Sequence, residues 1–139
     1  MITPDQFAEL MRGASDEDLV AGLRENGALI LDEIFRQMED RVDPQESQGV
    51  EAIVEWHIRL PDAAEPDRFQ VAIADGRCKV QRDGTAQPRT TLRVGGLDFL
   101  KIVAGQVNPL RLFMFGKMKV EGDLMFAARM NSLFEVPEG

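Results

Sequence analysis

The stretch VEAIVEWHIRL, residues 50–60, constrains the fold of this chain most strongly, because apolar residues occupy every second position in it. The apolar positions are Val50, Ala52, Val54, Trp56, Ile58 and Leu60. A period of two residues is that of a β-strand, whose successive side chains point to opposite faces of a sheet. One face of this strand is therefore predicted to be buried and the other wet, as in an antiparallel sheet covered on one side.

Three more stretches alternate in the same way, at residues 68–75, 77–83 and 89–94. The first two are separated by Asp75-Gly76, and Asp-Gly between alternating runs is a strong signal for a tight hairpin turn. The sequence therefore predicts four consecutive strands, of which the second and third form a hairpin.

A fifth strand is predicted over 117–121, KMKVE, which is too short and too alternating for a helix. In it, Met118 and Val120 share one face, whereas Lys117 and Lys119 share the other. This strand should therefore have an apolar face and a basic face.

The chain before the first strand is predicted to be helical. Pro4 suits the first position of one helix, and Ser15 suits the N-cap of a second. We expect Asn26-Gly27 to end that second helix. A third helix over 28–41 carries a single apolar stripe, so we expect it to lie across the sheet.

Helical patterns return after the fourth strand, over 97–104 and 109–115, and end the chain over 124–134. Asn108 and Asp123 precede the last two and suit their N-caps. Helices, four strands, two short helices, one strand and one helix predict an α+β fold with helices on one face of the sheet. With 139 residues the chain fits a single domain, which we divide into an N-terminal helical segment (1–45) packed on a core (46–139).

The distribution of charge indicates which partners are plausible. The net charge is −8, which argues against nucleic acid, yet residues 89–134 carry seven basic and three acidic side chains, a net +4. We predict that four of these basic residues hold an acidic head group or contact an anionic membrane; the alternative is an uneven but merely solvated surface. The four are Arg93, Arg111, Lys117 and Lys119.

The sequence offers little for catalysis. His57 is the only histidine and lies on the polar face of its strand, so we expect a surface residue. Cys78 is the only cysteine and alternates inward, so we expect a small core residue. No phosphate-binding loop or nucleophile elbow is present, and a single histidine excludes a multi-histidine metal site. We therefore expect no enzyme, cofactor or metal; an enzyme that uses His57 is the least favoured alternative.

Apolar residues are in surplus between 110 and 134. The helix over 109–115 is apolar on nearly every side, and such a helix is expected to be enclosed on every side. Four of the seven methionines lie in this region, and flexible methionines suit a wall that adapts to varied apolar ligands. From composition alone, the core, a dimer interface and a ligand cavity all remain possible uses of this surplus.

The stretch GKMKVEGDLMFAARM, residues 116–130, resembles the signature of the sterol carrier protein 2 (SCP2) family, and LDFLKIVAGQVNPLRLFMFGK, residues 97–117, resembles the part that precedes it. The resemblance extends over about 50–134. The matching positions are Gly105, Asn108, Pro109, Phe113, Gly116, Lys117, Lys119, Gly122 and Asp123.

The resemblance implies a five-stranded, mostly antiparallel sheet with helices over one face and an internal hydrophobic tunnel. Members of the family bind sterols, fatty acids, fatty acyl-CoA and other lipids without catalysing a reaction. The chain ends in Pro-Glu-Gly and not in a peroxisomal Ser-Lys-Leu type signal, which favours a free-standing binder over a peroxisomal carrier. Since the sequence shows no signal peptide, no membrane-spanning run and a single cysteine, we expect a cytoplasmic protein. The alternative is an accessory or scaffold protein whose apolar C-terminal helices dock on a partner enzyme or form a homodimer.

We predict that the lipid contacts the inward face of the sheet and the helices beside it. The predicted lining residues are Trp56, Phe69, Val71, Phe99, Val103, Leu110, Phe113, Met114, Met118, Val120, Met125, Met130 and Phe134.

Overall fold

The computed structural model describes residues 4–129, and their strands form one sheet in the order β3-β2-β1-β4-β5. The strands are β1 (Ala52–Arg59), β2 (Asp67–Ala74), β3 (Arg77–Arg82), β4 (Thr90–Gly95) and β5 (Met118–Gly122). Of the neighbouring pairs only β1–β4 is parallel, and the other three are antiparallel. The predicted five-stranded, mostly antiparallel α+β fold is therefore confirmed, and alternation located every strand to within two residues.

The turn at Asp75-Gly76 joins β2 to β3, as predicted. Both residues have positive φ, 55° at Asp75 and 72° at Gly76. Two consecutive left-handed residues match the twist of the flanking strands, and Asp and Gly tolerate this conformation well. The turn chemistry thus fixes the register of the hairpin, in which Ala74 pairs with Arg77.

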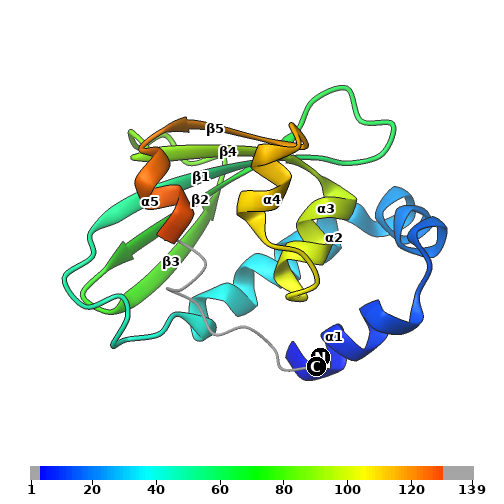
Figure 1. Ribbon diagram of the computed structural model, residues 1–139, viewed down its shortest axis with the longest axis horizontal. Helices are drawn as coiled ribbons and strands as arrows, with labels where there is room; N and C mark the ends of the chain where they lie inside the picture. The colour runs from blue at the N-terminus through cyan, green and yellow to red at the C-terminus, as the bar shows by residue number, and fades with distance from the viewer. Residues whose placement is uncertain (1–3, 130–139) are drawn as a thin grey trace.

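The helices lie on one side of the sheet (Figure 1). They are α1 (Pro4–Gly13), α2 (Asp16–Arg41), α3 (Gly96–Val103), α4 (Pro109–Met114) and α5 (Leu124–Arg129). Figure 1 shows α1 farther from the sheet than α2. The predicted final helix over 124–134 is described only as far as Arg129, and its remainder lies outside the described residues.

The expected break between two N-terminal helices lies where the sequence placed it, as a kink within α2. Asn26 departs from helical geometry, with φ −136° and ψ 26°, and separates two helical segments of the 26-residue element. A Cβ on Gly27 would lie 2.8 Å from the side chain of Leu60. Gly27 therefore allows close packing against the chain after β1, directly after the kink at Asn26. The predicted start is confirmed, because Ser15 and Asp18 form a reciprocal capping box.

Aromatic rings hold α2 and α3 against the covered face of the sheet. Phe35 of α2 stacks on Phe69 of β2, with ring centroids 4.0 Å apart, and on Phe99 of α3 at 5.2 Å. Trp56 of β1 meets Phe99 edge-on at 5.2 Å. All four side chains are buried, so this cluster is the centre of the core.

The outer edge of β3 is partly covered by α2. The backbone N–H of Val80 donates a hydrogen bond to the Glu39 carboxylate, at 2.7 Å. Burial, followed by the nearby charge of Glu39, raises the pKa of the Cys78 thiol to about 12. Cys78 packs against the core, as expected of a small structural residue.

The expectation that the helix over 109–115 is enclosed on every side is wrong. Of the residues in α4 only Leu112 is buried. Leu110 and Met114 are exposed, and so is Phe115, which follows the helix. Six residues are too few for α4 to bury both its sides against one edge of the sheet. Within residues 4–129, no helix is long and apolar enough to cross a bilayer.

Candidate functional site

An apolar cleft of about 190 Å³ lies between α4, β5 and α5. We call it the C-terminal cleft. Apart from the cap Asn108, its lining residues are apolar. They are Asn108, Pro109, Leu110, Phe113, Met118, Val120, Leu124, Met125, Ala127 and Ala128. Its floor is the apolar face of β5, where Met118 and Val120 alternate with lysines that point the other way.

Two caps fix the walls of this cleft. The Asn108 side chain accepts a hydrogen bond from the backbone N–H of Leu110, at 2.9 Å, and Pro109 occupies the first turn of α4. The Asp123 carboxylate accepts one from the N–H of Phe126, at 2.9 Å, at the start of α5. The sequence predicted both caps, and the structure confirms them.

Arg89 anchors α5 from the side of β4. Its guanidinium pairs with Asp123 at 2.9 Å and lies 4.4 Å from the centre of the Phe126 ring, which is buried. The N–H of Phe126, together with this guanidinium, holds the pKa of Asp123 below its ordinary value. One arginine thus holds both the cap and the buried side of α5.

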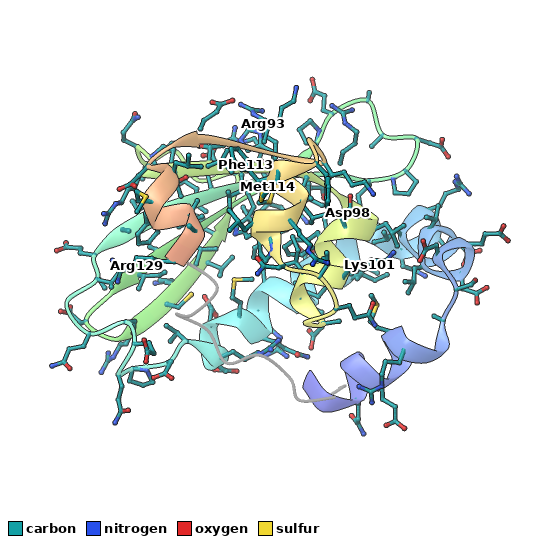
Figure 2. The ribbon with its side chains drawn as sticks, in the orientation of Figure 1. Arg93, Asp98, Lys101, Phe113, Met114 and Arg129 are labelled. Atoms are coloured by element: carbon teal, nitrogen blue, oxygen red, sulfur yellow. The ribbon has the colours of Figure 1, made fainter. Side chains whose placement is uncertain are left out.

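The rim of the C-terminal cleft is apolar and open to solvent. Of its lining residues, Met125 is 76% exposed, and Leu110 and Leu124 are each about half exposed. Met114 and Phe115, at the end of α4 and outside the lining, are also exposed. Figure 2 shows Phe113 and Met114 on α4, beneath the edge of the sheet formed by β4 and β5. Because soluble domains rarely leave neighbouring large apolar side chains uncovered, this rim points to an apolar occupant.

The predicted lining residues separate into groups. Those that line the C-terminal cleft are Leu110, Phe113, Met118, Val120 and Met125. Those in the packed core are Trp56, Phe69, Val71 and Phe99. Met114 is exposed on α4 and does not line the cleft, and Val103 lines a different groove, described next. Met130 and Phe134 lie outside the described residues.

A second apolar groove, of about 620 Å³, lies between α1, α2 and α3. We call it the N-terminal groove. It is lined by Leu10, Met11, Ala14, Asp18, Leu19, Gly22, Asn26, Leu29, Ile30, Glu33, Ile34, Gln37, Arg41, Leu100 and Val103. The prediction from sequence missed this groove. The available signal was the run Ala28-Leu29-Ile30-Leu31, which is broader than one helical stripe and leaves Leu29 69% exposed.

A third cleft, of about 280 Å³, lies on the sheet face that the helices leave open. We call it the basic cleft. It is lined by His57, Arg59, Pro66, Arg93, Val94, Gly95, Gly116, Lys117 and Lys119. It thus brings together three of the four predicted head-group residues, whereas Arg111 is exposed on α4, outside the cleft.

Polar side chains form a chain of hydrogen bonds across the open face. Glu121 pairs with Arg93 Nε at 2.9 Å, and Arg93 Nη1 lies 3.0 Å from His57 Nδ1. His57 Nε2 lies 2.6 Å from the Glu55 carboxylate. Since arginine can only donate, Nδ1 accepts and Nε2 carries the proton that His57 donates to Glu55. His57 is half-buried within this network and less exposed than a simple surface position implies.

Glu55 ends this network on the β2 side. Its other oxygen accepts a hydrogen bond from Gln70 Nε2 at 2.8 Å, and Arg68 lies 4.0 Å away. Burial acts to raise the pKa of Glu55, but the hydrogen bonds from His57 and Gln70 and the charge of Arg68 outweigh it, so the pKa lies below its ordinary value. Glu55 is therefore ionised at neutral pH and holds His57 in place.

Comparison of the sequence with models of known protein families identifies one family for this chain. A family model described as the SCP-2 sterol transfer family matches residues 31–135, more than half of the 139 residues. The chain belongs to the SCP-2 sterol transfer family. The resemblance noted from the sequence is thus confirmed.

The relatives of this SCP-2 family chain are distant. It is 23% identical over 124 residues to the peroxisomal multifunctional enzyme type 2 of Mus musculus, an alignment that covers 88% of this chain and 17% of that protein. The chain spans about a fifth of the length of the curated relatives it matches, between 17% and 20%.

Two of the solved structures with a similar fold are sterol carrier proteins. Sterol carrier protein 2 from Yarrowia lipolytica in its apo form is 20% identical with a TM-score of 0.62, and the match covers 75% of this chain and 86% of that one. Palmitated SCP2L2 from Aedes aegypti is 22% identical with a TM-score of 0.59, covering 76% and 96%. At these identities the likeness establishes the architecture.

The SCP-2 family match begins at Leu31, midway along α2. The C-terminal cleft and the basic cleft lie wholly within the matched residues. Most of the N-terminal groove is built by residues 10–30, which precede the match. The C-terminal cleft is therefore our candidate functional site.

Proposed function

We propose that this chain is a non-enzymatic lipid-binding protein that holds the apolar part of its ligand in the C-terminal cleft. One observation carries the proposal: Leu110, Leu124 and Met125 line an apolar cleft and are exposed to solvent, in a member of the SCP-2 sterol transfer family. A sterol, a fatty acid or a fatty acyl-CoA would bury these side chains. The palmitated relative makes a fatty acid the first ligand to try.

The size of the cleft sets an expectation for its ligand. Pockets that enclose small ligands usually measure roughly 300–1,000 Å³, and the C-terminal cleft measures about 190 Å³. Methionine has three rotatable bonds, so Met118 and Met125 can shift to widen the cleft between α4 and α5 toward a tunnel. Burying about ten methylenes at ~0.8 kcal/mol each stabilises the complex by roughly 8 kcal/mol before association costs. Micromolar or weaker binding follows, which suits a carrier that must also release.

The same exposed rim also supports a second candidate. An apolar surface on α4 and α5 could dock on a partner enzyme or a second copy of this chain. The mouse relative favours this alternative, because the matched part is 17% of a multifunctional enzyme. Protein stripped of lipid that is dimeric and binds no lipid would favour the docking role over the carrier role.

The test is a titration with a fluorescent fatty acid and competition by unlabelled palmitate. Leu110→Asp with Met125→Asp places two charges at the C-terminal cleft, at positions already exposed to solvent, so the fold should survive. We expect saturable binding that this double variant weakens at least about tenfold, since an unpaired charge at an apolar wall must be desolvated. Native mass spectrometry of the purified protein would identify any lipid that it retains.

Leu29→Asp is the matched control, because Leu29 is also an exposed leucine but lines the N-terminal groove. It should leave binding unchanged. If Leu29→Asp abolished binding and the double variant did not, the ligand would occupy the N-terminal groove. If no sterol, fatty acid or acyl-CoA bound the wild-type protein, the proposed function would be wrong.

A further inference from the structure

The basic cleft is built from two rows of residues across three strands. In the first row His57 of β1 pairs in register with Arg93 of β4, which pairs with Lys119 of β5. In the second row Arg59 pairs with Gly95, and Lys117 comes one residue before Met118, the partner of Val94. Because side chains alternate along each strand, both rows lie on the open face. The pairing of the strands therefore determines which residues line the basic cleft.

Gly95 leaves a hollow in the middle of the second row. A Cβ at this position would have no atom within 4 Å. Arg59 and Lys117 thus flank a position that carries no side chain, and Gly116 adds a second glycine to the lining. Position 95 is therefore open space between Arg59 and Lys117 on this face.

Three of the cationic side chains in the basic cleft have no ion-pair or hydrogen-bond partner within the described residues. Within residues 4–129, Arg59, Lys117 and Lys119 make no ion pair or side-chain hydrogen bond. Arg93 is held by Glu121 and His57 and keeps further N–H groups free to donate. None of the described residues that line the cleft is acidic.

This charge pattern contrasts with the rest of the chain. The lining holds four arginine or lysine residues and no carboxylate, whereas the whole chain carries a net −8. A concave surface lined by charges of one sign concentrates counter-ions of the other. Arg93 is paired with Glu121, but Arg59, Lys117 and Lys119 repel one another unless an anion binds between them.

We propose that the basic cleft binds a phosphate monoester group, carried either by a soluble compound or by a lipid head group. A phosphate monoester has a charge of about −1.5 to −2 at neutral pH and three acceptor oxygens, which matches several uncommitted donors better than a carboxylate does. Arginine and lysine bind such groups in complementary ways, the one through a planar fork and the other as a point charge. Gly95 provides the floor for the phosphate.

This site is separate from the proposed lipid site. Met118 and Val120 of β5 line the C-terminal cleft on the covered face, whereas Lys117 and Lys119 line the basic cleft on the open face. The sheet lies between the two, so the phosphate proposal holds whether or not an apolar ligand binds beneath α4 and α5.

The first experiment is a titration of the ¹⁵N-labelled protein with inorganic phosphate, at constant ionic strength maintained with sodium chloride. We expect saturable shifts confined to the amides near Gly95, Gly116 and Lys119. In Lys117→Glu with Lys119→Glu the affinity should fall at least about tenfold, because two donors become repulsive charges. Gly95→Asp should have a similar effect while keeping its backbone unstrained, since φ is −73° there, and Gly95→Ala is its control.

Arg77→Glu with Lys79→Glu is the matched control for the lysine pair. It reverses two exposed basic residues spaced two apart on β3, on the same face but at the opposite edge of the sheet. It should leave the affinity for phosphate unchanged. If both double variants lost phosphate affinity equally, the loss would result from the change in net charge alone, and the proposal would be wrong.

Vesicles distinguish the two sources of phosphate. Sedimentation is measured with phosphatidylcholine vesicles with and without phosphatidic acid, which bears a phosphate monoester. Binding of vesicles that contain phosphatidic acid, lost in Lys117→Glu with Lys119→Glu, would assign a lipid head group. Binding of inorganic phosphate without vesicle binding would assign a soluble compound. If neither inorganic phosphate nor these vesicles bind at the cleft, the proposal is wrong.

Discussion

The two faces of the sheet are built from the same strands and are stabilised in different ways. On the covered face, Phe35, Phe69, Phe99 and Trp56 pack ring against ring and exclude water. On the open face, Glu55, His57, Arg93 and Glu121 form a hydrogen-bonded line across β1, β4 and β5. The same strands supply both faces, because successive side chains along a β-strand point to opposite sides of the sheet.

This difference predicts how each face responds to change. Packing free energy scales with buried apolar area and depends little on pH or salt. A hydrogen-bonded charge network contributes less per residue and depends on the ionisation of its members. Substitutions on the covered face should therefore change stability most, and those on the open face should change binding and pH dependence.

The largest effect is expected for Phe99→Ala on the covered face. Phe99 is fully buried between Phe35 and Trp56, so the cavity should cost about 3–5 kcal/mol of the free energy of unfolding. Urea denaturation followed by circular dichroism measures this. Phe115→Ala is the control, because Phe115 is 73% exposed, and it should change stability by no more than about 0.5 kcal/mol. Equal losses in the two variants would contradict a core centred on Phe99.

A smaller effect is expected for Glu55→Gln on the open face. The variant keeps the size of the side chain but removes the carboxylate that accepts hydrogen bonds from His57 and Gln70. The free energy of unfolding should fall by about 1–2 kcal/mol at pH 7. Since folding lowers the pKa of Glu55 from its ordinary 4.5, this stabilisation is complete above that value and is lost as pH falls through the folded pKa.

Urea denaturation at pH 7 and at pH 3 tests the sign of this effect. The stability difference between the wild type and Glu55→Gln should be present at pH 7 and shrink at pH 3. A difference that stays constant or grows in acid would show that Glu55 acts through packing and not through charge.

The smallest effect on stability is expected for Lys117→Glu with Lys119→Glu. Both lysines are exposed and unpaired within the described residues, so the free energy of unfolding should change by less than about 0.5 kcal/mol. Thermal unfolding measures it. A large loss of stability would mean that the two lysines of the basic cleft stabilise the fold. The open face would then contribute to stability as the covered face does.

Much of the architecture follows from local patterns in the sequence. Alternation located the strands, and the caps Ser15, Asn108 and Asp123 located helix starts, because each depends on neighbours within a few residues. The parallel pairing of β1 with β4 was not contained in such patterns, since it depends on where the β2–β3 hairpin packs. The same holds for Gly27, whose role depends on contact with Leu60 after β1.

The sites were predictable to a lesser degree. The two faces of β5 were visible in KMKVE, and they line the C-terminal cleft and the basic cleft. The hollow at Gly95 was not, because it depends on Gly95 lying between Arg59 and Lys117 in the assembled sheet. The N-terminal groove escaped prediction because it depends on the packing of α1 against α2 and α3.

The hydrogen bond from Val80 to Glu39 also bears on how the molecule avoids joining its neighbours. A free sheet border invites another chain to add a strand, which is the first step toward aggregation. Here the N–H of Val80 on the β3 border is occupied by a carboxylate from α2. The β5 border carries the charged residues Lys119 and Glu121. Both features oppose the addition of a neighbouring copy's strand to this sheet.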